Sequence, residues 1–103
     1  MNKSKHRTKF QIIADMLFTA GKGSKKTHIM YGANLSYKLV CQYLKDLLEC
    51  GLVRHASGEY SVTEKGREFI RKYQEYSESR KELREQINEI NNKKLTLEKF
   101  ISE

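Results

Sequence analysis

The side chains best suited to chemistry stand along residues 34–45, where hydroxyl, amide, thiol and ammonium groups recur at helical spacing. Apolar residues at three- and four-residue steps predict a helix over about residues 35–50, with leucines and a valine on its buried side. Acids enter this helix only near its end, as Asp46 and Glu49. An exposed face of donors and cations suits phosphates and base edges. The side chains on that face are Tyr37, Lys38, Cys41, Gln42 and Lys45.

The charge of the chain is unevenly distributed along its 103 residues, which carry a net charge of +7. Residues 1–67 hold 12 Lys and Arg against 5 Asp and Glu, whereas residues 68–103 hold 8 of each sign. All of the excess therefore belongs to the first two-thirds. A one-sided excess of this kind predicts an anionic polymer, and hence nucleic acid, as partner. A basic domain without such a partner is the alternative.

Cations that could meet phosphates lie outside the predicted helix as well as on it. Such contacts displace condensed counterions from DNA, so that affinity falls steeply with salt. They fix position without reading sequence, and only Gln42 has the bidentate geometry for a base, preferentially adenine. We therefore expect binding with little sequence preference. The predicted phosphate-binding cations are Lys5, Arg7, Lys25, Lys26, Lys38, Lys45 and Arg54.

The sequence offers little for catalysis or for metal binding. Cys41 and Cys50 are nine positions apart, about 13 Å along one helix, which is too far for a disulfide. The three histidines stand at no zinc-site spacing. The stretch GKGSKK lacks the spacing of a phosphate-binding loop, and no nucleophile–base pair or paired carboxylates can be placed. We expect no enzymatic activity, no cofactor and no metal.

Two absences bear on location. No run of 18 apolar residues exists that could span a membrane, and the basic N-terminal stretch lacks the apolar segment of a secretory signal. We expect an intracellular protein, in the cytoplasm and associated with the nucleoid.

Local signals predict the helices that position these residues. Residues 1–7 read as a flexible basic arm. Thr8 followed by Gln11 is a capping-box pattern, and it begins an amphipathic helix that ends near Gly21. Ser24 is expected to cap a short second helix that Gly32 stops. The turn into the third helix is so tight that the pair predicts a helix-turn-helix.

A hairpin is predicted directly after the third helix. Leu52 and Val53 begin one strand, residues 60–62 form the other, and a turn is centred on residues 57–58. The inner side chains of the hairpin must pack on the helices, because a bare hairpin is only marginally stable. That packing leaves Arg54, His55 and the glycine tip facing outward, as a wing in which Glu59 departs from a purely basic pattern.

The last helix follows Thr63 and has no stop signal before the C-terminus. Its apolar residues follow a heptad seam that only Arg80 and Lys94 interrupt, which predicts a coiled coil with another copy of the chain. Two basic seam residues disfavour an in-register parallel pair, where each would meet its own copy. A lone helix that packs only through its first aromatic residues is the alternative. The predicted dimerisation residues are Phe69, Tyr73, Tyr76, Leu83, Ile87, Ile90, Leu97 and Ile101.

The run THIMYGANLSYKLVCQYLKDLLECGLV, followed by GEYSVTEKG, resembles the small winged-helix DNA-binding proteins of hyperthermophilic crenarchaea, which are chromatin-type proteins that dimerise through a C-terminal antiparallel coiled coil. The resemblance covers about residues 10–76, and IMYGANLSY is its most specific part. It implies a recognition helix over residues 34–45 and a wing over residues 54–59. Carried over by position, it implies major-groove contacts from Ser36, Tyr37, Lys38, Cys41, Gln42 and Lys45, and flanking contacts from Arg54, His55 and Ser57.

The predicted fold class is mainly α (α+β): a winged helix-turn-helix with a two-stranded wing and a long C-terminal helix that forms an antiparallel coiled-coil dimer. Its predicted parts are the arm over residues 1–7, the winged helix over residues 8–67 and the dimerisation helix over residues 68–103. Three functions remain open. The first is a chromatin-like protein that binds duplex DNA with little specificity and bridges or compacts it. The second is a sequence-specific transcriptional regulator, and the third is a protein-interaction module that uses its coil and wing.

Overall fold

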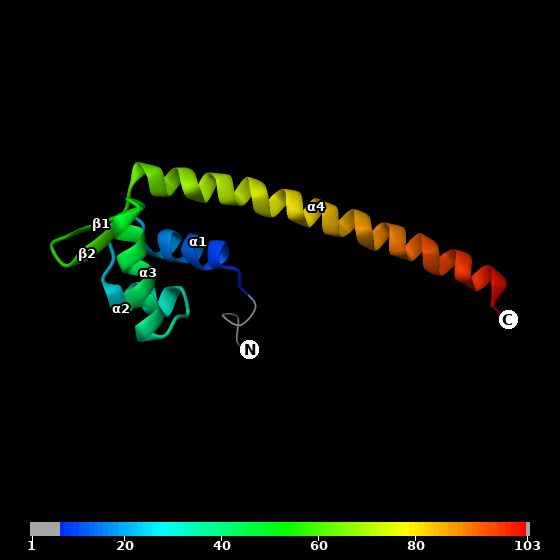
Figure 1. Cartoon of the computed structure of the whole chain (residues 1–103), viewed down its shortest axis with the longest axis horizontal. Helices are drawn as coiled ribbons and strands as arrows, with labels where there is room; N and C mark the ends of the chain where they lie inside the picture. Colours follow the sequence, from blue (N-terminus) through cyan, green and yellow to red (C-terminus); the bar gives the residue numbers. More distant parts are fainter. Residues whose placement is uncertain (1–6, 103) are drawn as a thin grey trace. The chain divides into compact units, whose positions relative to one another are not determined.

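The computed structural model describes residues 7–102. Three helices, a hairpin and a long fourth helix follow one another along the chain (Figure 1). The chain divides into two compact units, of which one ends at Tyr73 and the other begins at Gln74. This mainly helical order with an antiparallel two-stranded wing confirms the predicted fold class, while the coiled-coil dimer stays a prediction. The elements are α1 (Lys9–Ala20), α2 (Lys26–Gly32), α3 (Tyr37–Glu49), β1 (Val53–Ala56), β2 (Glu59–Val62) and α4 (Glu64–Ile101).

The first unit encloses a small apolar core made by α1, α2, α3 and the start of the hairpin. Its largest fully buried side chains are Met16, Leu17, Ile29, Val40 and Leu47. The inward face of α3 is narrower than its sequence suggested, since Leu39 and Leu48 are each 38% exposed. In the part of the chain that the structure describes, no helix is both long and apolar enough to cross a membrane.

The turn between α2 and α3 is closed by backbone hydrogen bonds. The Leu35 N–H donates to the Met30 carbonyl at 2.9 Å, and the Asn34 N–H donates to the Tyr31 carbonyl at 3.2 Å. This is a Schellman motif, in which the residue after the cap takes a left-handed conformation. Asn34 does so with φ of 55°, which asparagine tolerates better than most residues. Ser36 then caps α3, since its hydroxyl accepts the Leu39 N–H.

Ser24 corrects one prediction, because it does not cap α2. Lys25 occupies the cap position without a side-chain hydrogen bond. The Ser24 backbone instead pairs with Tyr60 through hydrogen bonds of 2.9 and 2.8 Å, so it adds a short third strand segment to the hairpin. Its hydroxyl donates to the carbonyls of Thr19 and Ala20 at the end of α1. An extended backbone at this position therefore joins α1 to the wing.

The wing is a tight hairpin whose predicted turn is confirmed. Ser57 and Gly58 both have positive φ, 54° and 76°, as the type I′ turn of a two-residue hairpin requires. The strands are longer than expected, because residues predicted as loop pair across the hairpin. His55 faces Tyr60, and Arg54 faces Ser61 on the alternate side.

The start of α4 packs tightly on the end of α3 and on the hairpin. The Thr63 hydroxyl accepts the Gly66 N–H at 3.1 Å and donates to the Gly51 carbonyl at 2.6 Å. Gly66 is buried, and a Cβ there would collide with the Leu52 carbonyl oxygen. Phe69, one turn later, packs against the core of the first unit. The first turns of α4 therefore belong to the winged unit.

Candidate nucleic-acid interface

The outer side of α3 presents the polar residues that the sequence selected. Ser36, Tyr37, Lys38, Gln42 and Lys45 are exposed, and Cys41 is half-buried. Spacings of three, four and seven residues from Lys38 place Cys41, Gln42 and Lys45 on one side of the helix. Tyr37 is 60% exposed at the first turn. These side chains can reach a ligand beside the helix; their contact with DNA stays a prediction.

Lys26 connects the start of α2 to the first two turns of α3. Its Nζ lies 5.6 Å from the centroid of the Tyr37 ring, a cation–π distance, and it hydrogen-bonds to the Cys41 side chain. The neighbouring Cys41 chiefly, and then Tyr37 and Tyr60, raise the pKa of Lys26 above its ordinary value of 10.5. Lys26 is therefore a cation at the junction of two helices. Lys25 beside it is exposed.

His55 is stacked on Tyr60, and this contact holds the wing near the start of α2. The two ring centroids lie 4.1 Å apart and the ring planes differ by 1°. Tyr60 is buried, and its backbone pairs with Ser24, just before α2 begins. Arg54 and Ser57 are exposed. The stacking was not predicted, although a two-residue turn at residues 57–58 fixes the pairing of His55 with Tyr60.

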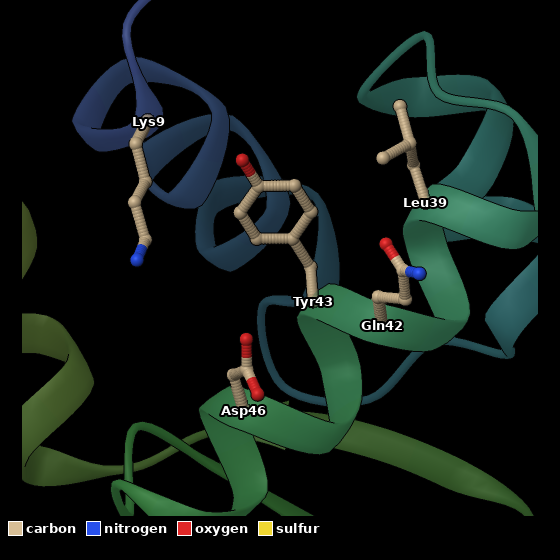
Figure 2. Close-up of a pocket in the computed structure, with 5 residues that line it drawn as sticks. All are labelled: Lys9, Leu39, Gln42, Tyr43 and Asp46. Carbon is tan, nitrogen blue, oxygen red and sulfur yellow. The ribbon is translucent and has the colours of Figure 1, made fainter.

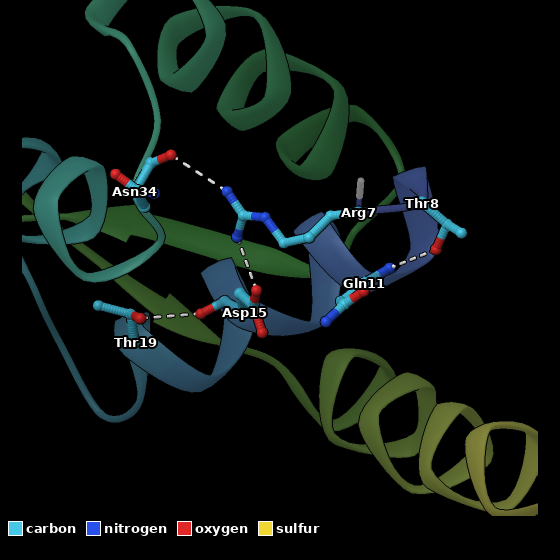
Figure 3. Close-up of polar contacts among 6 residues, drawn as sticks. All are labelled: Arg7, Thr8, Gln11, Asp15, Thr19 and Asn34. Atoms are coloured by element: carbon cyan, nitrogen blue, oxygen red, sulfur yellow. Dashed lines mark hydrogen bonds and ion pairs between the residues drawn. The ribbon is translucent and has the colours of Figure 1, made fainter. Parts of the chain in front are cut away.

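Arg7 is placed differently from the sequence expectation (Figure 3). Its side chain is only 7% exposed, and its Nη1 lies 2.7 Å from the Asp15 carboxylate on α1. Its Nη2 donates to the Asn34 carbonyl at 3.1 Å. The structure thus corrects the expectation that Arg7 belongs to a free arm and meets phosphate, because its guanidinium is enclosed and already engaged. Lys5, the other predicted arm contact, lies outside the described residues.

An open hollow of about 230 Å³, which the sequence did not predict, lies between α1 and α3. Figure 2 shows the Tyr43 ring between Lys9 of α1 and the α3 residues Leu39 and Gln42, with Asp46 below it in this view. A second hollow of about 210 Å³ shares Lys9, Tyr43 and Asp46 with the first. Gln42 is the predicted DNA-contacting residue that lines this side of α3. Within residues 7–102, no group of three or more His, Cys, Asp or Glu could hold a metal ion.

The predicted seam residues of α4 differ in exposure along the helix. Phe69 and Tyr73 are half-buried in the first unit. In the second unit, Leu83 and Ile87 line a hollow of about 220 Å³ together with two arginines. Apolar seam side chains that are exposed in the single chain are available to pack against a second helix. The exposed seam residues, from 47% to 84%, are Tyr76, Leu83, Ile87, Ile90, Leu97 and Ile101.

The geometry of the first unit defines a class of protein. Two helices joined by the tight turn at Asn34, the second of them capped and amphipathic, form a helix-turn-helix. The hairpin that follows at once, with Tyr60 held in the core and the turn exposed, is its wing. This arrangement is the winged helix, which carries a recognition helix for DNA.

Comparison with known proteins agrees with this geometry. Residues 6–81 match the sequence model of a family described as winged helix-turn-helix. An uncharacterised protein of Methanocaldococcus jannaschii is 39% identical over 70 residues, 67% of this chain but only 33% of that protein. The chain thus spans about a third of the length of this relative. A second uncharacterised protein of the same organism is 29% identical over 69 residues, 66% of this chain and 71% of that protein.

Solved structures share the fold. Sso10a-2, described as a DNA-binding protein from Sulfolobus solfataricus, has a TM-score of 0.75 and 23% identity, over 84% of this chain and 95% of that chain. A MarR family protein of Mycobacterium tuberculosis has a TM-score of 0.60 and 18% identity, over 96% and 78% of the two chains. ZitR of Lactococcus lactis has a TM-score of 0.58 and 17% identity, over 98% and 74%. At such identities these likenesses show the fold alone.

The chain belongs to the winged helix-turn-helix family. This is a family of DNA-binding domains and typically not of enzymes.

Proposed function

We propose that this protein binds duplex DNA mainly through phosphates, with little sequence preference, and that α3 is its recognition helix. The observation that carries the proposal is the exposed side of α3, where Lys38, Gln42 and Lys45 stand without an acid until Asp46. Lys26 extends this side toward α2, and Arg54 extends it onto the wing. A surface of this kind gains affinity by releasing counterions from the DNA backbone.

The proposed contact set comprises Lys5 and residues at α2, α3 and the wing. It excludes Arg7, whose guanidinium is enclosed by protein. The fold shared with Sso10a-2, itself described as a DNA-binding protein, supports the same use of the head. A DNA-binding protein works where the chromosome is, so we place it on the nucleoid, in the cytoplasm. The proposed contacts are Lys5, Lys25, Lys26, Ser36, Tyr37, Lys38, Cys41, Gln42, Lys45, Arg54, His55 and Ser57.

A salt-titrated binding series on a set of unrelated duplexes tests this proposal. The logarithm of the association constant should fall linearly with the logarithm of salt concentration, by about 0.9 for each phosphate contacted. The double variant Lys38→Ala/Lys45→Ala should weaken binding to all duplexes alike and lower that slope by about 2. Lys93→Ala, which removes one exposed lysine from α4, is the matched control and should leave the slope unchanged. An unaltered slope in the double variant would exclude α3 from the interface.

We further propose that two copies pair through α4 as an antiparallel coiled coil. The support is the heptad seam, whose apolar members are exposed in the single chain. Replacing Leu83 and Ile87 by glutamine should shift the protein from dimer to monomer in sedimentation equilibrium. The control variant Glu82→Gln/Gln86→Glu changes two positions that lie off the seam, and it should leave the dimer intact. A wild-type protein that sediments as a monomer at micromolar concentration would end this part of the proposal.

An antiparallel pair carries its two heads at opposite ends of the coil, which favours bridging or compaction of separate duplex segments. Light scattering of mixtures with short duplexes should then show two duplexes for each dimer. Complexes that hold one duplex only, at every protein-to-DNA ratio, would contradict bridging.

A sequence-specific transcriptional regulator is the second candidate. Gln42 favours it, because its exposed amide can hydrogen-bond a base edge in two places. A regulator should prefer its site by roughly a thousandfold or more over random DNA. Equal affinity for unrelated duplexes excludes it, and a discrete footprint on chromosomal fragments would establish it. If no duplex binds at low salt, the protein-interaction module becomes the better account.

A further inference from the structure

Arg7 joins two parts of the winged unit that lie far apart in the sequence. One end of its guanidinium meets Asp15, eight residues later on α1, and the other meets Asn34, 27 residues later in the turn before α3. Figure 3 shows the side chain lying between these two partners. Arginine is suited to such a bridge because its planar fork offers donors in two fixed directions.

The carbonyl of Asn34, an exposed residue, accepts none of the backbone hydrogen bonds that close this turn. The Schellman bonds of this turn satisfy the carbonyls of Met30 and Tyr31, and α3 begins its own ladder with the Ser36 carbonyl. Asn34 lies between these two systems in a left-handed conformation. The bond from Arg7 satisfies its carbonyl and fixes the orientation of the peptide that leads into α3.

The burial of Arg7 indicates that both bonds matter. Its side chain is 93% enclosed, and among the described residues its Nε is a buried polar atom without a hydrogen-bond partner. Leaving that N–H unpaired is unfavourable, so the two contacts through the other nitrogens must hold the guanidinium in place. Asp15 is itself anchored on α1, where Thr19 donates to its carbonyl.

We propose that Arg7 is a positioning residue for DNA binding: it braces the turn at Asn34 against α1 and so sets the direction in which α3 meets the duplex. Arg7 touches no DNA in this account. The proposal rests on the DNA-binding function proposed above. It goes beyond that function by assigning to a buried ion pair the alignment of the recognition helix.

The sign of a charge change tests this idea. Asp15→Asn removes a negative charge, so that simple electrostatics predicts tighter binding to DNA. Positioning predicts weaker binding, because the guanidinium loses its ionic partner on α1. We expect affinity to fall by about tenfold, which corresponds to the lower end of the loss of one charge-assisted hydrogen bond. Glu49→Gln, which removes an exposed acid of α3 without a buried partner, is the matched control and should bind equally or more tightly.

Arg7→Lys supplies the charge-neutral test. An ammonium cannot hold both acceptors in the geometry of the fork, so affinity should fall while the salt slope stays at its wild-type value. The control Arg67→Lys, at an exposed position of α4, should change neither quantity. Arg7→Lys and Arg67→Lys are both compared with the wild-type protein well below their unfolding temperatures. Amide hydrogen exchange at residues 34–37 should be faster than in the wild-type protein for Arg7→Lys and unchanged for Arg67→Lys.

The outcomes separate the possibilities. The variant Arg7→Gln removes the cation, and a salt slope that falls by about 0.9 in it would make Arg7 a phosphate contact and overturn the proposal. Wild-type affinity in both Arg7→Lys and Asp15→Asn, with lower stability, would reduce the ion pair to a purely structural role and overturn it as well. Failure of the wild-type protein to bind any duplex is a different result, since it removes the proposed function itself.

Discussion

Gly66 offers the sharpest quantitative prediction for the fold, because α4 approaches the rest of the winged unit most closely there. In an ordinary exposed helix, Gly→Ala stabilises by up to about 1 kcal/mol. At Gly66 the added methyl group would overlap the Leu52 carbonyl oxygen and lie 2.5 Å from Cγ2 of Val62. The carbonyl belongs to the backbone, and its neighbour Thr63 donates its N–H to it at 3.1 Å, so it cannot move freely.

Overpacking of this kind costs about 3 kcal/mol at the upper end of its usual range, which leaves Gly66→Ala destabilised by about 2 kcal/mol after the helix gain. For a unit of this size that corresponds to a fall in Tm of about 8–16 °C. The assay is urea and thermal unfolding followed by circular dichroism, at one fixed protein concentration because association shifts apparent stability. Glu68→Ala, on the exposed side of the same helix, should change stability by less than about 0.5 kcal/mol.

Val62→Ala in the Gly66→Ala background should recover only part of the loss, because it removes the side-chain contact and leaves the backbone contact in place. Full recovery in the double variant would show that the carbonyl is not the obstacle. A Gly66→Ala protein as stable as wild type would refute the close approach of α4 altogether.

Three further predictions follow from local contacts. Gly32→Ala should destabilise by about 1–3 kcal/mol, because its Cβ would meet the Thr19 side chain, and Thr19→Ala in that background should restore stability in urea unfolding. Thr63→Ala should cost about 1–2 kcal/mol by the same assay, since it removes the α4 cap and the bond to the Gly51 carbonyl. The pKa of Lys26 is raised above its ordinary value of 10.5, so the ammonium form is favoured in the folded chain, and this preference is lost as pH rises through the higher folded value. Nitrogen-15 or carbon-13 NMR titration of Lys26 should therefore give a midpoint above 10.5, and a midpoint below it would contradict the contacts with Cys41.

Local chemistry explains why much of the fold was predictable. The Thr8 hydroxyl accepts the Gln11 N–H at the start of α1, as the capping pattern indicates. Gly51, with φ of 78°, ends α3 as a left-handed residue. The Ser57-Gly58 turn sets the hairpin register. Each of these signals involves residues within a few positions of one another, so the sequence carries them directly.

The features that sequence reading missed depend on distant partners. Ser24 looks like a helix cap until Tyr60, 36 positions later, pairs with its backbone. Arg7 looks like part of a solvated basic arm until α1 and the turn at Asn34 are placed around it. Leu39 fits the apolar period of α3 but is partly exposed, because the neighbouring elements cover a narrower stripe than the period permits. No local pattern encodes such tertiary choices.

The charge distribution connects the head and the proposed coil in one measurable quantity. Residues 68–103 carry equal numbers of both signs, so the phosphates counted by the salt slope should belong almost entirely to the head. If both heads of a dimer occupy one duplex, the slope should be about twice that of a monomeric seam variant. If the heads hold separate duplexes, the slope per duplex should match that of the monomer while scattering reports bridging. The same titration therefore distinguishes how the two heads are used, and it does so without knowledge of any preferred DNA sequence.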